Sequence, residues 1–257
     1  MTQISFSTNF SIQSIKNIRC LIKTPLQRNG FALVRAENVY PILADLVLMP
    51  WAYQWKSFSS SWCHLETDGY MADGGCYRQR RYATFLLSAR GAFLQPHQPH
   101  YQTLDYNPLN GGVDRWFEPV CSKLIESLIL RSILQLVYQV VTELTSLPLL
   151  WHVEMHQFRI EARLGQVGFP TPEGVHRDGV DWICVVMIQR ENIVYGETSV
   201  YNLHHQCVGR FTLMQALDMT FIDDHRVYHG VTAIEAVKSD QPAYRDVLVL
   251  TLRKKEL

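Results

Sequence analysis

The hydrophobic pattern of the chain changes at Pro148, and this change constrains the fold more than any other feature. After Pro148, short runs rich in β-branched residues alternate between apolar and polar positions, with Gly, Pro, Asn and Asp between them. The runs are 151–161, 182–188, 194–201, 210–214, 219–222, 227–233 and 245–252. Such runs predict strands joined by turns, as in a sandwich or a double-sheet jelly roll. Because no helical pattern lies between them, a parallel α/β fold is disfavoured.

The chain before Pro148 is expected to wrap around this β core. Apolar residues recur at helical spacing in 39–49 and in 120–147, and the second segment predicts a long helix with one broad apolar face. Residues 61–119 are rich in Gly, Pro, His and Arg and predict irregular loops with short strands. We therefore expect one domain over residues 1–257, with a helical and loop-rich region at 1–150 and the β core at 151–257.

Composition excludes several classes of protein. The chain has 24 Lys plus Arg and 24 Asp plus Glu, and this zero net charge argues against a nucleic-acid partner. The six cysteines follow no metal or disulfide spacing, and the N-terminus lacks a secretory pattern, so we expect free thiols in the cytoplasm. The most apolar stretch, 124–141, contains charged and amide residues that a membrane span would exclude.

A His-x-Asp pair is the first sign of chemistry. His176 and Asp178 are two positions apart in a glycine-flanked segment, so on extended backbone both side chains point to the same side. An imidazole and a carboxylate are two of the three ligands in non-haem Fe(II) oxygenases. The alternative is a simple His–Asp hydrogen bond in a turn.

A third ligand is available in residues 223–230. His225 and His229 lie on the same side of this segment at a period of two, and either could complete a site of two histidines and one carboxylate.

The last strand carries an arginine in an apolar setting. Arg245 shares one face of the strand with Val247, Val249 and Thr251. Its guanidinium group could form an ion pair at a sheet edge, or it could bind a carboxylate through two parallel hydrogen bonds. A dicarboxylate co-substrate that chelates a metal at one end would need such a partner at the other.

The chain resembles the Fe(II)/2-oxoglutarate dioxygenases, and within them the bacterial free amino acid hydroxylases such as isoleucine 4-hydroxylase and pipecolic acid hydroxylase. The resemblance covers roughly residues 78 to 252. It rests on the stretches RQRRYATF, YNPLNGGVDRWFEP, HQFRI, PTPEGVHRDGVD, IDDHRVYHGVT and YRDVLVL. It implies a distorted double-stranded β-helix of the jelly-roll, cupin-like kind with flanking N-terminal helices.

The resemblance also implies the roles of the main polar residues. It assigns the iron to His176, Asp178 and His229, and the 2-oxoglutarate carboxylate to Arg245. Arg253 competes for this last role, although its place beside two lysines favours a solvated tail.

Further residues are expected around this centre. Asp224 is expected to support the ligands or to form a turn. The polar face of strand 151–161, with Gln157 and Arg159, is expected to line the co-substrate pocket, although Arg159 could equally be a buried structural residue. Thr171, in the segment before His176, is assigned to the same pocket.

Three residues are candidates for contact with the substrate. Glu173 could receive an ammonium group, or it could be a carboxylate at the pocket mouth. Arg81 and Tyr82 could help to close the site, while the default for the basic run at 78–81 is a solvated face.

The remaining histidines point to no second site. Residues 151–156 resemble a zinc-protease motif, but Glu154 lies midway between His152 and His156 instead of directly after the first histidine. The pair at 204–205 is expected in a surface turn, and His97 and His100 in an exposed loop.

The reaction that follows from the resemblance uses Fe(II), 2-oxoglutarate and dioxygen, releases succinate and CO2, and hydroxylates an aliphatic carbon. The expected substrate is a small free L-amino acid such as pipecolate, isoleucine or leucine. Alternatives are a carrier-bound amino acid, sulfoxidation or desaturation, and a cupin-like module that binds metal without turnover. A homodimer is left open.

Overall fold

One large antiparallel sheet forms the backbone of the molecule. The computed structural model describes residues 2–6, 10–47, 50–145 and 150–255. The strands of the large sheet are β1 (Gln3–Ser5), β2 (Phe31–Val34), β3 (Glu66–Thr67), β4 (Arg78–Ser88), β5 (Gly91–Leu94), β6 (Leu150–Ala162), β7 (Trp182–Glu191), β11 (Met219–Asp223) and β14 (Ala243–Lys255). Their spatial order is β1-β5-β4-β6-β14-β7-β11-β2, and β3 pairs with β4. The last strand of the chain therefore lies between β6 and β7, inside the sheet.

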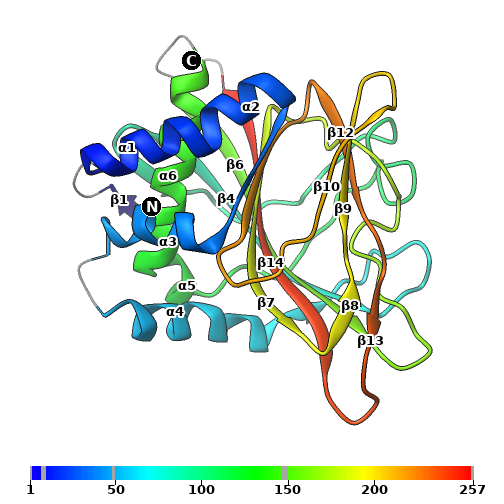
Figure 1. The fold of residues 1–257 in the computed structure, drawn as a ribbon. Coiled ribbons are helices and arrows are strands. Elements are labelled where there is room, and N and C mark those ends of the chain that lie inside the picture. The colour runs from blue at the N-terminus through cyan, green and yellow to red at the C-terminus, as the bar shows by residue number, and fades with distance from the viewer. Residues whose placement is uncertain (1, 7–9, 48–49, 146–149, 256–257) are drawn as a thin grey trace.

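A second layer faces this sheet (Figure 1). It contains β9 (Thr198–Asn202), β10 (Cys207–Phe211) and β12 (Val227–Val231), beside a pair formed by β8 (Ile193–Tyr195) and β13 (Ile234–Ala236). Apolar side chains from both layers, including Met187, Val200 and Val247, form a core between them. The jelly-roll prediction is confirmed, and every predicted run contains strand residues, although run 194–201 covers both β8 and β9.

Helices cover the outer face of the large sheet (Figure 1). They are α1 (Ile12–Ile18), a π-helix (Arg19–Lys23), α2 (Thr24–Asn29), α3 (Ala36–Ala44), α4 (Trp51–Ser59), a 3-10 helix (Ser60–His64), α5 (Ser122–Ile125) and α6 (Leu128–Leu144). Within the described residues, no helix combines the length and the apolar character needed to cross a membrane.

Two predicted helices differ from the observed ones. The expected helix 120–147 is divided into α5 and α6, because Ser127 takes an extended conformation and caps α6 by accepting a hydrogen bond from the Ile129 N–H. Residues 146–147 of that prediction lie outside the described residues. The helix expected at 39–49 is observed as α3, which begins at Ala36, ends at Ala44 and has Pro41 in its interior. Residues 48–49 of that prediction also lie outside the described residues.

Strand β4 is the main element that the sequence pattern missed. It spans eleven residues within the region expected to be loops and short strands, and it pairs with β6 along ten positions from Arg78 to Leu87. Its alternation directs Arg78 and Arg80 to the interior of the fold, where both are buried. The expected solvated basic face is therefore wrong for these two residues.

The two faces of strand β6 have different surroundings. The face with Gln157 and Arg159, which we expected to line the co-substrate pocket, points away from it. Gln157 is fully buried and donates to the Ser61 hydroxyl of the 3-10 helix. Arg159 forms two hydrogen bonds, of 2.8 and 2.7 Å, with the Asp246 carboxylate. Because both side chains are engaged away from the pocket, the co-substrate role expected for them is wrong, and Arg159 is a structural residue.

This ion pair yields a prediction about stability. In Arg159→Met, the Asp246 carboxylate would stay buried without its partner, and we expect the free energy of unfolding to fall by about 3 kcal/mol. Chemical denaturation measures this value. The double variant Arg159→Met/Asp246→Leu should recover most of the loss, because it leaves no unpaired charge. Equal stability of wild type and Arg159→Met would contradict the structural role.

Candidate metal centre and its pocket

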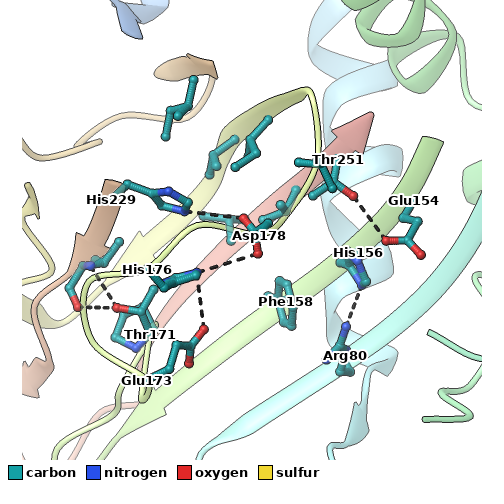
Figure 2. Close-up of a pocket in the computed structure, with 18 of the residues that line it drawn as sticks. Arg80, Glu154, His156, Phe158, Thr171, Glu173, His176, Asp178, His229 and Thr251 are labelled. Carbon is teal, nitrogen blue, oxygen red and sulfur yellow. Dashed lines mark hydrogen bonds and ion pairs between the residues drawn. The ribbon is translucent and has the colours of Figure 1, made fainter. Parts of the chain in front are cut away.

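Three potential metal ligands meet in the pocket between the two layers (Figure 2). His176 and Asp178 lie in the loop that connects β6 to β7, and His229 lies on β12. The His176 Nε2 atom is 3.7 Å from Asp178 Oδ1, and the His229 Nε2 atom is 3.6 Å from Asp178 Oδ2. Two imidazole nitrogens and one carboxylate oxygen at these distances form a donor set suited to a divalent transition metal.

Backbone hydrogen bonds hold the two histidines at this separation. The N–H of His176 donates to the His229 carbonyl at 2.9 Å, and the N–H of His229 donates to the His176 carbonyl at 2.9 Å. The His176 Nδ1 atom lies 3.0 Å from the Gly174 carbonyl, which requires the proton to be on Nδ1. The Nε2 atom of His176 is therefore the one that faces Asp178 and can bind a metal ion in place of a proton.

Asp224 fixes the segment that carries Asp178. Its carboxylate accepts the backbone N–H groups of Asp178, Gly179 and Val180 at 3.0, 2.7 and 3.0 Å. Gly179 has a φ of +74°, and a Cβ atom there would meet the ring of Tyr106 at 2.5 Å. Glycine therefore allows the chain to turn directly after Asp178.

The electrostatics of this cluster favour a positive charge beside Asp178. Burial disfavours charge on His176, but hydrogen bonding to Asp178, together with the charges of Asp178 and Glu173, raises the pKa of His176 to about 9. Burial and the neighbouring His176 lower the pKa of His229 to about 4. At neutral pH these pKa values place one additional proton on His176 and leave His229 neutral. A divalent cation could replace that additional proton and bind all three groups.

His225 does not belong to this cluster. Its side chain is 69 % exposed, and its Nε2 atom lies 3.0 Å from an oxygen of Asp181. Of the two histidines that the sequence left open, the structure brings only His229 to His176 and Asp178.

Arg245 lines the same pocket and has the features of a binding site for an anion. Its side chain is buried, its Nε atom has no hydrogen-bond partner, and it forms no ion pair with any described residue. Burial, together with the nearby charge of Arg190, lowers the pKa of Arg245 to about 10, so the group stays charged at neutral pH. Val247 and Val249 lie beside it on the pocket wall. A dicarboxylate with an apolar middle fits this arrangement.

Glu173 and Thr171 also line the pocket. The Glu173 Oε1 atom is 3.4 Å from His176 Nε2, and its Oε2 atom is buried without a hydrogen-bond partner. The Thr171 hydroxyl accepts from the Val231 N–H at 2.9 Å and donates to the Val231 carbonyl at 3.1 Å. These bonds link the loop between β6 and β7 to β12, so Thr171 has a structural role that the sequence did not indicate.

Two other candidates lie outside the pocket lining. Arg81 points away from it and donates to the carbonyls of His64 and Pro119 and to Glu66. Tyr82 is buried, and its hydroxyl donates to Glu154 Oε1 at 2.9 Å. The expected direct role of Arg81 in closing the site is therefore wrong, while Tyr82 orients a residue that does line the pocket.

A polar group that the sequence analysis missed lines the pocket near β4 and β6. It consists of Arg78, Arg80, His100, Gln102, Arg115, Glu154 and His156. His100 is only 6 % exposed, which corrects the expectation of an exposed loop histidine. The alternation of 78 with 80, and of 154 with 156, is the signal that would have placed these side chains on one face.

Within this group, His100, Glu154 and His156 also lie close enough to hold an ion. Two of these groups already have strong partners: His156 Nδ1 accepts from Arg80 at 2.6 Å (Figure 2), and Glu154 accepts from Tyr82 and lies 3.3 Å from His100. A cationic guanidinium at that distance opposes a second metal ion. The cluster of His176, Asp178 and His229 is therefore the better candidate for the metal centre.

Comparison with known proteins agrees with this geometry. Residues 59–251, most of the chain, match the family model of the 2OG-Fe dioxygenases. A 3(1)-hydroxy-L-isoleucine 4-dioxygenase from Pantoea ananatis is 26% identical over 186 residues, which cover 70% of this chain and 74% of that protein.

Solved structures share the fold. The crystal structure of a bsmA homolog from Methylobium petroleophilum PM1 has a TM-score of 0.77 and 33% identity, covering 92% of both chains. The crystal structure of IDO from Bacillus thuringiensis has a TM-score of 0.75 at 16% identity, covering 95% of this chain and all of that one. The chain therefore belongs to the 2OG-Fe dioxygenase family and is an oxygenase that uses Fe(II), 2-oxoglutarate and dioxygen.

Proposed function

We propose that this enzyme hydroxylates an aliphatic carbon of a small free L-amino acid with an aliphatic or cyclic side chain. The observation that carries the proposal is a cluster of two histidines and one carboxylate that lines the same pocket as a buried arginine without an ion-pair partner among the described residues. The similarity to an enzyme named for its action on a hydroxylated isoleucine supports an amino acid as the substrate class.

His176, Asp178 and His229 are the proposed iron ligands. The two backbone hydrogen bonds between His176 and His229 place both Nε2 atoms near the Asp178 carboxylate. Asp224 accepts a hydrogen bond from the backbone N–H of Asp178 and so holds that residue in place. Bound Fe(II) supplies the oxidation: dioxygen gives one oxygen atom to succinate, as 2-oxoglutarate loses CO2, and the other to the C–H bond of the substrate.

Arg245 is the proposed partner of the distal carboxylate of 2-oxoglutarate. Its charge is unpaired among the described residues, and the valines beside it match the two methylene groups of that molecule. Glu173, with its unpartnered Oε2 atom, is the proposed acceptor of the substrate ammonium group. The six cysteines are free, which is consistent with our placement of the enzyme in the reducing cytoplasm.

The first prediction from the proposed function concerns the hydrogen bonds by which Asp224 holds the backbone around Asp178. In Asp224→Asn, three charge-assisted hydrogen bonds to residues 178–180 become weaker, and we expect about tenfold or greater loss of Mn(II) affinity by calorimetric titration. Asp223→Asn is the matched control, because the neighbouring carboxylate accepts from the His225 N–H instead. Unchanged affinity in Asp224→Asn would show that this support is not needed.

The second prediction concerns the co-substrate. Arg245→Ala should raise the KM for 2-oxoglutarate by about tenfold or more, since a desolvated charge-assisted pair contributes about 1.5–3 kcal/mol. Mn(II) affinity should stay close to that of wild type. Arg253, which we expected in a solvated tail, is half-buried at the other end of β14 and also lines the pocket, and its Nε atom has no hydrogen-bond partner. Because the proposal gives the distal carboxylate to Arg245, Arg253→Ala should leave the KM for 2-oxoglutarate unchanged. Sensitivity of Arg253 together with tolerance at Arg245 would refute the assignment.

The third prediction concerns the substrate. The proteinogenic L-amino acids and L-pipecolate are incubated with Fe(II), 2-oxoglutarate and air, and succinate and the mass gain of one oxygen are measured. At least one free aliphatic or cyclic amino acid should give both products. Turnover only with peptides or carrier-bound amino acids would overturn the proposed substrate class and leave the iron chemistry intact.

A further inference from the structure

The pocket contains a second buried arginine without a carboxylate partner. Arg115 is only 2 % exposed, its Nε atom has no hydrogen-bond partner, and it forms no ion pair with any described residue. It resembles Arg245 in all three respects. A buried charge without a counter-charge is costly, and a bound anion would remove that cost. Two such arginines in one pocket indicate two carboxylates.

The position of Arg115 is closely tied to the proposed metal centre. It lies in the loop between β5 and α5, where its backbone forms a pair of hydrogen bonds with His100 at 2.9 and 3.0 Å. Its Nη2 atom donates to Gln102 Oε1 at 2.9 Å, and Gln102 Nε2 donates to Asp178 Oδ1 at 3.2 Å. One side chain thus separates the guanidinium group from a proposed iron ligand.

The nearby charges leave Arg115 without an internal counter-ion. The buried carboxylates of this region have other partners: Asp68 binds Arg78 at 2.7 Å and Arg80 at 3.3 Å, and Glu154 accepts from Tyr82. Arg80 is held between the rings of Phe117 and Phe158, at 3.5 and 4.5 Å from their centres. Two guanidinium groups therefore share one carboxylate, and the charge of Arg115 adds to an existing positive excess.

We propose that Arg115 binds the α-carboxylate of the amino acid substrate, which makes it the counterpart of Arg245 at the 2-oxoglutarate end. This inference rests on the proposed function and assigns the substrate carboxylate, which the sequence analysis left without a partner. Arg81 is unsuited, because its guanidinium group is engaged outside the pocket.

The surroundings of Arg115 also suit the ammonium group on the same carbon. Burial and the charge of Arg78 lower the pKa of Arg115, whereas the carboxylates of Asp68, Glu173 and Glu154 act in the opposite direction. Glu173 lines the same pocket as Arg115, and its Oε2 atom has no hydrogen-bond partner. A cationic and an anionic group that line one pocket match the two charges of an α-amino acid.

The test compares each amino acid with its carboxamide, which lacks the negative charge. L-isoleucine, L-leucine, L-pipecolate and their carboxamides are assayed by substrate-dependent succinate formation with wild type and Arg115→Gln. Wild type should prefer the acid to the amide by about tenfold or more, and Arg115→Gln should lose that preference because the charge-assisted pair is absent. In the variant, the KM for the acid should rise while the KM for 2-oxoglutarate stays unchanged.

Arg81→Gln is the matched control. It removes the same charge from an arginine outside the pocket lining, and it should keep the wild-type preference for the acid. If Arg115→Gln does not fold, Arg115→Lys carries the test, since an ammonium group keeps the charge but cannot form two parallel bonds and should give an intermediate preference.

The outcomes separate this inference from the proposed function. If wild type oxidises none of these free amino acids, the proposed function fails for them. If wild type oxidises one of them but the preference for the acid is unchanged in the Arg115 variant that folds, the proposed function stands and the role of Arg115 is refuted. A rise in the KM for 2-oxoglutarate alone would likewise refute it.

Discussion

The pair of backbone hydrogen bonds between His176 and His229 is the interaction on which the site depends. It joins the loop before β7 to β12, two segments that are distant in the sequence, and it sets the separation of two imidazoles before any metal binds. Thr171 adds a second link between the same loop and Val231 of β12. Because Asp224 holds the backbone around Asp178, the geometry of the cluster rests on backbone contacts more than on the side chains themselves.

The buried arginines around this centre differ in whether a carboxylate of the protein neutralises their charge. Arg159 has a carboxylate of its own and is structural, whereas Arg245 and Arg115 are buried without one. An unpaired buried guanidinium group is destabilising in the empty enzyme and becomes favourable when a carboxylate binds. We infer that these two arginines lower the stability of the protein without ligands and raise its affinity for 2-oxoglutarate and for the amino acid substrate.

The sequence predicted the β core because strand alternation is a local pattern. It also named His176, Asp178 and His229 as candidate ligands, and the structure brings these three side chains into one cluster. Alternation with a period of two identifies strands, and the His-x-Asp spacing puts two ligands on one side. The pattern could not tell which face of β6 lines the pocket, because that depends on the neighbouring layer, and Gln157 and Arg159 were therefore assigned to the wrong side. Likewise, the Pro-rich context of His100 gave no sign that the loop folds inward, which only its pairing with Arg115 reveals.

The central claim is that one metal ion binds between His176, Asp178 and His229, and anomalous X-ray diffraction from crystals grown with Mn(II) and 2-oxoglutarate without oxygen tests it most directly. The account predicts one manganese peak within bonding distance of these three side chains, and a carboxylate of 2-oxoglutarate on Arg245. A manganese peak between His100, Glu154 and His156, with none at the first cluster, would contradict the account.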